Sequence, residues 1–330
     1  MDVTPEGSTR STQDTGADLA LDNVAVRRIL IPLDGSRLAE CVAGAATSLA
    51  ARFRARAILL HVLERGAPAT VHGDRHLREV AEAERYLRAV QSRWGAQGAV
   101  EMEWHVHPNE QRDVPGSIVD HAIDLGVDLI LLSTHGAGGT RRALFGSVAQ
   151  QVLRKGARPV LLVRPPATPG ESSFDPRLIF VPLDGVGPSA AALPIAGTLA
   201  RAYGAVLQLF TVVPTLGSVS GERTATAMLT PAATTLSLDL EETQAKDQLD
   251  TLEARLRATG LQVSGAVRRG DPAQGIVEEV RRLSPDMIVM ATHGHMGLDL
   301  VFSGSVADAI AGKVTQPILW VRIDDSAPAR

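Results

Sequence analysis

The chain has 330 residues, of which 45% are hydrophobic and 21% charged, and its formal net charge is −4 at pH 7. This length suits two domains, and the composition is ordinary for a globular protein. The slight negative charge and an aromatic content of 3% disfavour a nucleic-acid partner, because nucleic acids bind basic surfaces and stack on aromatic rings. No apolar run approaches the ~18 residues that a membrane span requires.

Residues 1–26 contain several acids and no apolar segment, so we predict a polar tail rather than a signal peptide. The single cysteine, Cys41, cannot form an intramolecular disulfide, which favours a reducing cytoplasm. We interpret Cys41 as a small buried residue of the first helix, with a redox role as the alternative.

The chain contains a tandem repeat. The apolar run that ends in Pro32-Leu-Asp34-Gly35 returns 150 residues later as Pro182-Leu-Asp184-Gly185. Two later Thr-His-Gly loops lie 158 residues apart, so about eight residues are inserted between these points. The polar, Thr-rich stretch 216–235 is the predicted place of the insertion. Each copy is the size of a domain.

Within each copy, strand-like runs alternate with segments of helical periodicity, which predicts a parallel sheet with right-handed crossovers. The strands expected in the first copy lie near residues 28–33, 57–63, 100–107, 129–133 and 159–163. The second helix of each copy has apolar residues three and four apart. They are Leu77, Val80, Ala83, Leu87 and Val90, and Ala245, Leu249, Leu252 and Leu256.

Residues 166–175 hold Pro and Gly without periodicity, so we predict a linker between domains 27–165 and 176–330.

A glycine-bearing loop follows the fourth strand of each copy. In the first copy nine residues separate Gly136 from the pair Gly146-Ser147, which begins a helix, and the second copy repeats this spacing. Ligands bind at the carboxyl edge of such sheets, and the free amides and dipole of a helix start attract phosphate. The sequence therefore predicts a phosphate site at each loop.

These loops resemble the nucleotide-binding signature of universal stress proteins, Gly-x2-Gly-x9-Gly-Ser/Thr. Each copy has the second glycine, the nine-residue gap and the final Gly-Ser, whereas Ser133 and Ala291 replace the first glycine. The resemblance covers nearly all of residues 27–323. It implies an α/β fold of two doubly wound domains, each a five-stranded parallel sheet in the order 3-2-1-4-5 with helices on both faces. It also implies that the final strands pair the two domains.

By this resemblance the protein binds ATP, ADP or AMP, with or without Mg²⁺, in one or both domains as a cytoplasmic stress-response protein, and it can form a homodimer. The implied nucleotide-binding residues of the first copy are Pro32, Asp34, Gly35, Ser36, Val62, Ser133, His135, Gly136, Gly139, Arg141, Gly146, Ser147 and Val148. Those of the second copy are Pro182, Asp184, Val212, Ala291, His293, Gly294, Gly297, Gly304, Ser305 and Val306.

Some of these residues have two interpretations. Asp34 and Asp184 could bind a ribose hydroxyl or an adenine amino group, or they could cap the first helix of their copy. His135 and His293 have no second metal-binding residue at ligand spacing. We therefore interpret each histidine as ordering its loop through a hydrogen bond.

The two loops differ in charge. The first has Arg141 where the second has Asp299. A cation attracts phosphate and a carboxylate repels it, so we expect the first copy to bind nucleotide more tightly.

Motifs of other nucleotide enzymes are missing. The sequence has no P-loop, no complete dinucleotide fingerprint and no serine-centred nucleophile elbow. We predict no dedicated catalytic residue and at most slow ATP hydrolysis. The alternatives are a nucleotide-free interaction scaffold, whose loops serve packing, and an ATP-using enzyme with an unrecognised general base.

Overall fold

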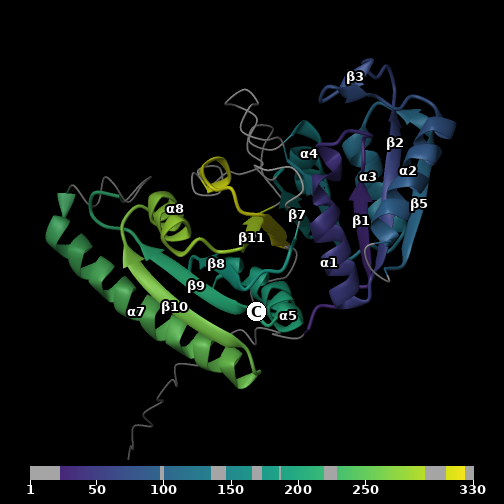
Figure 1. Cartoon of the computed structure of the whole chain (residues 1–330). Coiled ribbons are helices and arrows are strands. Elements are labelled where there is room, and N and C mark those ends of the chain that lie inside the picture. Colours follow the sequence, from purple (N-terminus) through teal and green to yellow (C-terminus); the bar gives the residue numbers. More distant parts are fainter. Residues whose placement is uncertain are drawn as a thin grey trace, which may run out of the picture.

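The computed structural model describes residues 23–96, 100–134, 146–165, 173–185, 187–218, 229–293 and 310–323, except for the side chain of His293. Strands and helices alternate through this part of the chain, and Figure 1 shows that they form two α/β halves. We call the unit from β1 to β7 domain 1 and the unit from β8 to β12 domain 2.

Domain 1 contains β1 (Arg28–Pro32), η1 (Ala39–Val42), α1 (Ala43–Phe53), β2 (Arg56–Glu64), β3 (Thr70–Val71), β4 (Asp74–Arg75), α2 (Val80–Gly95), β5 (Met102–Gln111), α3 (Val114–Asp124), β6 (Leu129–Ser133), α4 (Ser147–Lys155) and β7 (Val160–Val163). The five long strands lie where the sequence predicts them. Strands β2, β6 and β7 consist largely of buried side chains, which is typical of strands covered on both faces, whereas the edge strand β5 is mostly half-buried or exposed.

Domain 2 contains β8 (Leu178–Leu183), η2 (Pro188–Ala192), α5 (Leu193–Tyr203), β9 (Val206–Val213), α7 (Pro231–Ala258), β10 (Gln262–Arg269), α8 (Pro272–Leu283), β11 (Met287–His293) and β12 (Ile318–Ile323). Within the described ranges, no helix is long and apolar enough to cross a membrane.

The long strands form one ten-stranded sheet with the order β10-β9-β8-β11-β12-β7-β6-β1-β2-β5. Each domain therefore has the strand order 3-2-1-4-5, counted over its five long strands, with parallel pairing inside the domain. The last strands β7 and β12 pair antiparallel, with Leu161 opposite Leu319. This pairing joins two apolar edges that would otherwise be open to other chains.

The sheet separates two apolar core layers. One layer includes Leu49 of α1, Leu87 of α2 and Leu252 of α7, and Cys41 packs against it. Burial raises the pKa of the Cys41 thiol to about 12, which makes it a poor nucleophile. The other layer includes Ile118 of α3 and Val152 of α4. Each layer runs through both domains, because the sheet is continuous.

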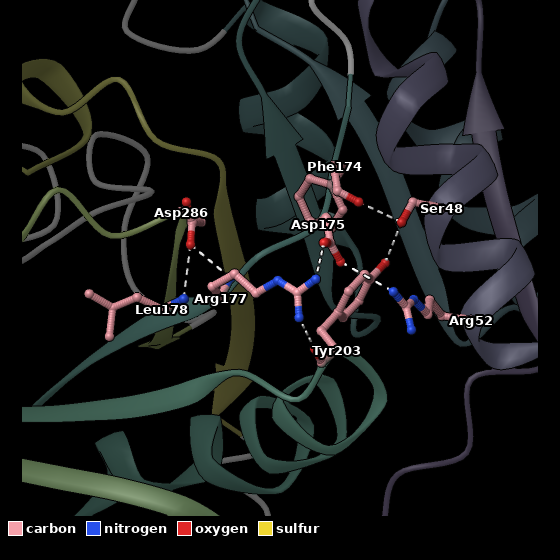
Figure 2. Close-up of polar contacts among 8 residues, drawn as sticks. All are labelled: Ser48, Arg52, Phe174, Asp175, Arg177, Leu178, Tyr203 and Asp286. Carbon is pink, nitrogen blue, oxygen red and sulfur yellow. Dashed lines mark hydrogen bonds and ion pairs between the residues drawn. The ribbon is translucent and has the colours of Figure 1, made fainter.

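A polar junction joins α1 to α5 beside the described end of the interdomain segment (Figure 2). Ser48 of α1 donates a 2.5 Å hydrogen bond to the carbonyl of Phe174, and its hydroxyl lies 3.0 Å from that of Tyr203 on α5. Arg52 lies over the Tyr203 ring and forms a 3.3 Å ion pair with Asp175. These contacts fix the chain where it enters domain 2.

Two arginines complete the contact between the domains. Arg164, which follows β7, donates to the carbonyl of Ala311 in domain 2. Arg322 of β12 donates a 2.9 Å hydrogen bond to the carbonyl of Gly156, which follows α4 in domain 1. A cation at the carbonyl end of a helix also interacts favourably with the helix dipole. The two bonds run in opposite directions across the β7–β12 pair.

The structure corrects four details of the sequence-based prediction. Helix α2 begins at Val80, so Leu77 precedes it, and the β3–β4 hairpin was not predicted. Residues 23–26 are not part of a free tail, because Val24 donates to Thr198 of α5 and Val26 is buried. The predicted insertion in part lengthens α7, which has 28 residues against 16 in α2. Most of the predicted linker, residues 166–172, lies outside the described residues.

Candidate functional site

A cavity of about 410 Å³ opens at the carboxyl edge of the domain 1 sheet. Its volume falls in the range of small-ligand pockets. The ends of β1, β2 and β6, the starts of α3 and α4, and the β3–β4 hairpin line it. Ligands of doubly wound sheets bind at this edge.

The start of α4 forms one wall of the cavity. Gly146 is the N-cap residue, with φ −46° and ψ 151°, and Ser147 and Val148 follow in the first turn. The first amide groups of a helix have no partner within the helix, so they can donate to an anion. The helix therefore supplies the donors and the positive dipole end that the sequence predicted for a phosphate site.

Asp34 lines the cavity and also organises the turn after β1. Its Oδ1 accepts bonds from the backbone N–H and the hydroxyl of Ser36, at 2.9 and 2.6 Å. Ser36 Oγ in turn accepts the Ala39 N–H, whereas Asp34 caps no helix directly. Asp34 therefore does not cap η1, whose N-cap residue is Leu38, and Ser36 connects the Asp34 turn to the first residue of that helix.

The turn needs a glycine at position 35. Gly35 has φ +92°, which L side chains rarely adopt, and a Cβ there would lie 2.8 Å from Leu77 Cγ. Leu77 thus packs against the turn rather than extending α2. The contact joins the Asp34 turn to the segment that follows the hairpin.

The β3–β4 hairpin contributes Val71 and His72 to the lining of the cavity. Its turn residues His72 and Gly73 both have positive φ, 52° and 87°, as a two-residue type I′ turn requires. Asp74 Oδ2 accepts the Arg37 N–H at 2.9 Å, which ties the hairpin to the Asp34 turn. His72 Nε2 lies 3.6 Å from Asp34 Oδ2, and both residues line the cavity.

Two buried histidines line the cavity beside this hairpin. His61 of β2 is 1% exposed, and its Nδ1 lies 2.7 Å from the carbonyl oxygen of Leu33. Burial lowers the pKa of His61, and the carbonyls of Leu33 and Leu77 oppose this shift. His76 is 5% exposed, and its Nε2 lies 3.8 Å from Glu64 Oε2. Neutral imidazole is thus the favoured form of His61.

The cavity brings together many of the predicted site residues of the first copy. The residues that line it are Pro32, Asp34, Val62, Ser133, Gly146, Ser147 and Val148. Gly35 and Ser36 do not line it, and Ser36 is fully buried in the turn. His135, Gly136, Gly139 and Arg141 lie outside the described residues.

The second copy is described only in part. Pro182 lies in β8, Asp184 follows it, Val212 lies in β9, and Ala291 and His293 lie in β11. Val212 packs near Gly275 of α8, since a Cβ on Gly275 would lie 3.2 Å from Val212 Cγ2. Gly294, Gly297, Gly304, Ser305 and Val306 lie outside the described residues.

Sequence reasoning missed the hairpin and the histidines of the cavity. The lining residues absent from the predicted set include His61, Glu64, His72, His76, Arg112 and Val114. The dipeptide His72-Gly73 was only a weak signal, because it supplies the glycine of a type I′ turn but not the Asn, Asp or Gly that usually precedes it. Nothing in the sequence indicated that His61 lines a cavity, since a single histidine in an apolar strand is normally interpreted as a core residue.

In the described ranges, no group of three or more His, Cys, Asp or Glu side chains is arranged to hold a metal ion.

Comparisons with known proteins agree with this architecture. The family model "Universal stress protein family" matches residues 25–164 and again 177–322. A universal stress protein of Methanocaldococcus jannaschii is 32% identical over 150 residues, which cover 42% of this chain and 83% of that protein.

Solved structures share the two-domain fold. A universal stress protein from Archaeoglobus fulgidus superimposes with a TM-score of 0.67 at 18% identity, over 91% of this chain and 100% of that chain. A protein from Pseudomonas aeruginosa PAO1, described as functionally unknown, superimposes with a TM-score of 0.65 at 17% identity, over 91% of this chain and 94% of that chain. Because the family model matches both halves, the chain belongs to the universal stress protein family in a tandem, two-domain form.

Proposed function

We propose that this protein binds an adenine nucleotide in the cavity of domain 1 and serves as a stress-linked sensor or reservoir of that nucleotide. The observation that carries the proposal is the start of α4 in the cavity wall, where Gly146 and Ser147 present free helix amides. Asp34 and Val62, at the ends of two neighbouring strands, line the same cavity. ATP, ADP and AMP share the phosphate and nucleoside that such a site recognises.

The test replaces the glycine at the start of α4. The φ and ψ of Gly146 are open to any residue, so Gly146→Val keeps the backbone and adds a side chain where phosphate must approach. We expect nucleotide affinity in domain 1 to fall at least about a hundredfold, by calorimetric titration of the full chain. Gly304→Val is the matched change in domain 2. Unchanged affinity in both variants, with intact circular dichroism, would place the site elsewhere.

The second candidate function is a nucleotide-free interaction scaffold. Ser133 favours it, because this residue replaces the first glycine of the signature and brings its side chain to the cavity wall. Equilibrium dialysis against labelled ATP, ADP and AMP, with and without Mg²⁺, separates the two functions. Bound nucleotide supports the sensor, and none at millimolar concentration supports the scaffold.

We also propose that the protein binds ATP without hydrolysing it efficiently. Asp34 and His61 could accept a proton, but both already hold structural contacts, with Ser36 and with the Leu33 carbonyl. Product analysis after long incubation with ATP should show slow hydrolysis or none. Rapid release of ADP or AMP would favour an ATP-using enzyme.

We also infer that the two domains act as an intramolecular pair through their final strands, with boundaries near 27–165 and 176–330. The β7–β12 pairing and the Arg164 and Arg322 bonds support this inference. Sedimentation velocity of the full chain tests whether a homodimer of whole chains forms in addition.

A further inference from the structure

The first turns of helix α7 pack against little of the described chain. Residues 231–237 are exposed except for the half-buried Thr234, and the first buried side chain of the helix is that of Leu238. Figure 1 shows α7 along the outer side of domain 2. Helices in proteins are stabilised mainly by packing of an apolar face, so these turns gain little from the contacts of their own domain.

Exposed leucines gather at this end of the helix. Within the described residues, the large hydrophobic side chains left exposed are Ile123, Leu216, Leu229, Leu236 and Leu240, and three of these five lie between residues 229 and 240. Leu229, just before α7, is 82% exposed, and Leu236 and Leu240 are 63% and 56% exposed. Single exposed apolar residues are common on protein surfaces, whereas a group of them marks a contact surface.

The leucines of the helix face away from the sheet. An α-helix turns by about 100° per residue, so Leu236 and Leu240 lie within about 40° of each other on one face. Leu238, Leu249 and Leu252 lie on the opposite face and are buried, the last two in a core layer. The N-terminal part of α7 is therefore apolar on two sides, of which only one packs on domain 2.

The outward side of α7 becomes acidic toward the C-terminus of the helix. By the same helical repeat Asp247 and Asp250 follow the leucines on this side, and both are exposed. Neither forms an ion pair within the described part of the chain. By contrast, Asp239 and Glu242 are both paired with Arg269 of β10. Two carboxylates are thus left for a partner.

We propose that the outer face of α7 binds a basic amphipathic helix of a partner protein. This outer face consists of Leu229, Leu236, Leu240, Asp247 and Asp250. Apolar residues of the partner pack on the leucines, as in other contacts that are made by one face of an amphipathic helix. Its lysines and arginines lie against the two aspartates. The surface is separate from the domain 1 cavity and does not depend on nucleotide binding.

Charge selects this occupant. A second copy of the chain, related by a two-fold axis, would place Asp247 and Asp250 against its own aspartates or leucines, and both arrangements are unfavourable. An anionic membrane surface would repel the same carboxylates. Residues 1–22 of the chain itself hold five acidic residues and one arginine, so they are poorly matched as well.

The test measures binding of labelled synthetic peptides to the full chain by fluorescence anisotropy. The probe is a helical peptide of leucine and lysine with leucines three and four residues apart, and its counterpart has glutamate in place of lysine. Leu236→Gln combined with Leu240→Gln removes the apolar part of the face, and Asp247→Asn combined with Asp250→Asn removes its charge. Glutamine is a good helix former and these positions are exposed, so the fold should be kept.

Helix α3 supplies matched controls. Ile123 is 61% exposed there, and the exposed Asp120 precedes it by one helical turn. Ile123→Gln and Asp120→Asn therefore make the same chemical changes on another acidic helix. Non-specific attraction of the peptide to exposed apolar or acidic side chains would affect both helices alike.

We expect the unaltered chain to bind the lysine peptide and not the glutamate peptide. The leucine double variant should weaken binding at least about tenfold, because two apolar contacts are lost. The aspartate double variant should weaken it about threefold at low salt and less at high salt. The α3 variants should leave it unchanged. Equal binding of the two peptides, or equal losses in the α3 and α7 variants, would overturn the proposal.

Other results would assign the outer face to a different occupant and so also overturn the proposal. If the unaltered chain binds neither peptide, its own residues cover the face. A dimer in sedimentation velocity that the leucine double variant abolishes would assign the face to a second copy. Binding to phosphatidylglycerol vesicles that the same variant abolishes would assign it to a membrane surface.

Discussion

The two domains agree in the polar contacts that hold the backbone. Asp128 accepts the N–H groups of Arg27 and Arg28 at the start of β1, and Asp286 makes the same contacts at the start of β8 (Figure 2). Asp113 caps α3, and Asp271, at the aligned position, caps α8. Both copies have thus kept the aspartate hydrogen bonds that set where strands and helices begin.

The domains differ in the side chains at the carboxyl edge. Aligned positions hold His61 and Thr211, Glu64 and Pro214, and Arg112 and Gly270. These changes leave the pairing of the strands intact, although β9 ends at Val213, one residue before the position aligned with the end of β2 at Glu64. The comparison teaches that the fold constrains the contacts at the starts of strands and helices, whereas the side chains at the carboxyl edge of the sheet have been free to diverge. We therefore expect the domains to be similar in stability and unequal in ligand binding.

The largest expected effect concerns the aspartate contacts that both domains make at the start of their first strand. Asp128→Ala and Asp286→Ala each remove two hydrogen bonds to a carboxylate, so each should lower the free energy of unfolding by about 1–2 kcal/mol. Urea denaturation of the full chain measures the loss. Asp124→Ala, at the exposed end of α3, is the control and should change stability by less than ~0.5 kcal/mol. A large effect in one domain alone would show that the two contacts are not equivalent.

A second prediction sharpens the difference in ligand binding. Exchanging the loop charges by Arg141→Asp and Asp299→Arg should shift nucleotide preference toward domain 2 by about fivefold at low salt, as expected for one charge near a surface phosphate. The shift should shrink as salt is raised, because exposed charges are screened. Calorimetric titration in the Gly146→Val and Gly304→Val backgrounds separates the domains. A shift that persists in high salt would contradict an electrostatic origin.

A third prediction concerns the end of the first helix. Arg54 ends α1 in the left-handed conformation, with φ 51°, where Gly204 ends α5 with φ 65°. A Cβ at Gly204 would meet no atom within 4 Å, so only backbone strain distinguishes the two positions. Arg54→Gly should therefore stabilise the chain by about 0.5–1 kcal/mol, and Gly204→Ala should destabilise it similarly. Thermal unfolding measures both, and changes of the same sign would refute the assignment to strain.

The sequence was sufficient for the features that depend on local pattern. The long strands, the duplication and the helix start at Gly146 all follow from short apolar runs and repeated glycines. The family resemblance added the strand order, which local pattern does not determine. The long-range contacts were not predictable, since nothing near Asp128 indicates that its carboxylate binds the start of β1.

The two buried histidines of the cavity were the largest omission. His61 and His76 come from different elements, and only the packing of Leu77 on Gly35 and the hairpin turn brings them to one cavity. Residues 231–235 of the Thr-rich stretch belong to α7, which was not predicted because Thr-rich sequence does not suggest the start of a long helix. Such features depend on tertiary contacts that outweigh local propensity.

The last and smallest expected effect concerns pH. In each domain a polar pair joins the third long strand to the third helix, but the residues of this pair differ between the two domains. In domain 1, His107 Nδ1 lies 3.4 Å from His121 Nε2, and the His105 ring centroid lies 5.1 Å from that of His121. In domain 2, Arg268 forms a 2.7 Å ion pair with Glu279, which is 1% exposed.

These pairs should respond to acid in different pH ranges. Burial, and after it the charge of His121, lowers the pKa of both His105 and His107 from the usual 6.5. The unfolded chain therefore binds protons at higher pH than folded domain 1, and stability present above pH 6.5 is lost as pH falls below it. A hydrogen bond from Arg282 lowers the pKa of Glu279 from 4.5, so its contribution persists until the pH falls below that value.

Between pH 7 and 5.5 we accordingly expect domain 1 to lose stability while domain 2 does not. The change is small, because His105 is exposed and water screens its charge, and the melting temperature should fall by on the order of 2 °C. Hydrogen exchange, corrected for intrinsic rates, should locate the loss in β5 and α3 rather than in β10 and α8. Replacing both strand histidines by glutamine should abolish the part of the loss that lies in β5 and α3, whereas the buried His61, whose pKa is also lowered, should still contribute at β2. Equal loss of protection in the two domains would instead assign the acid response to the net charge of the whole chain.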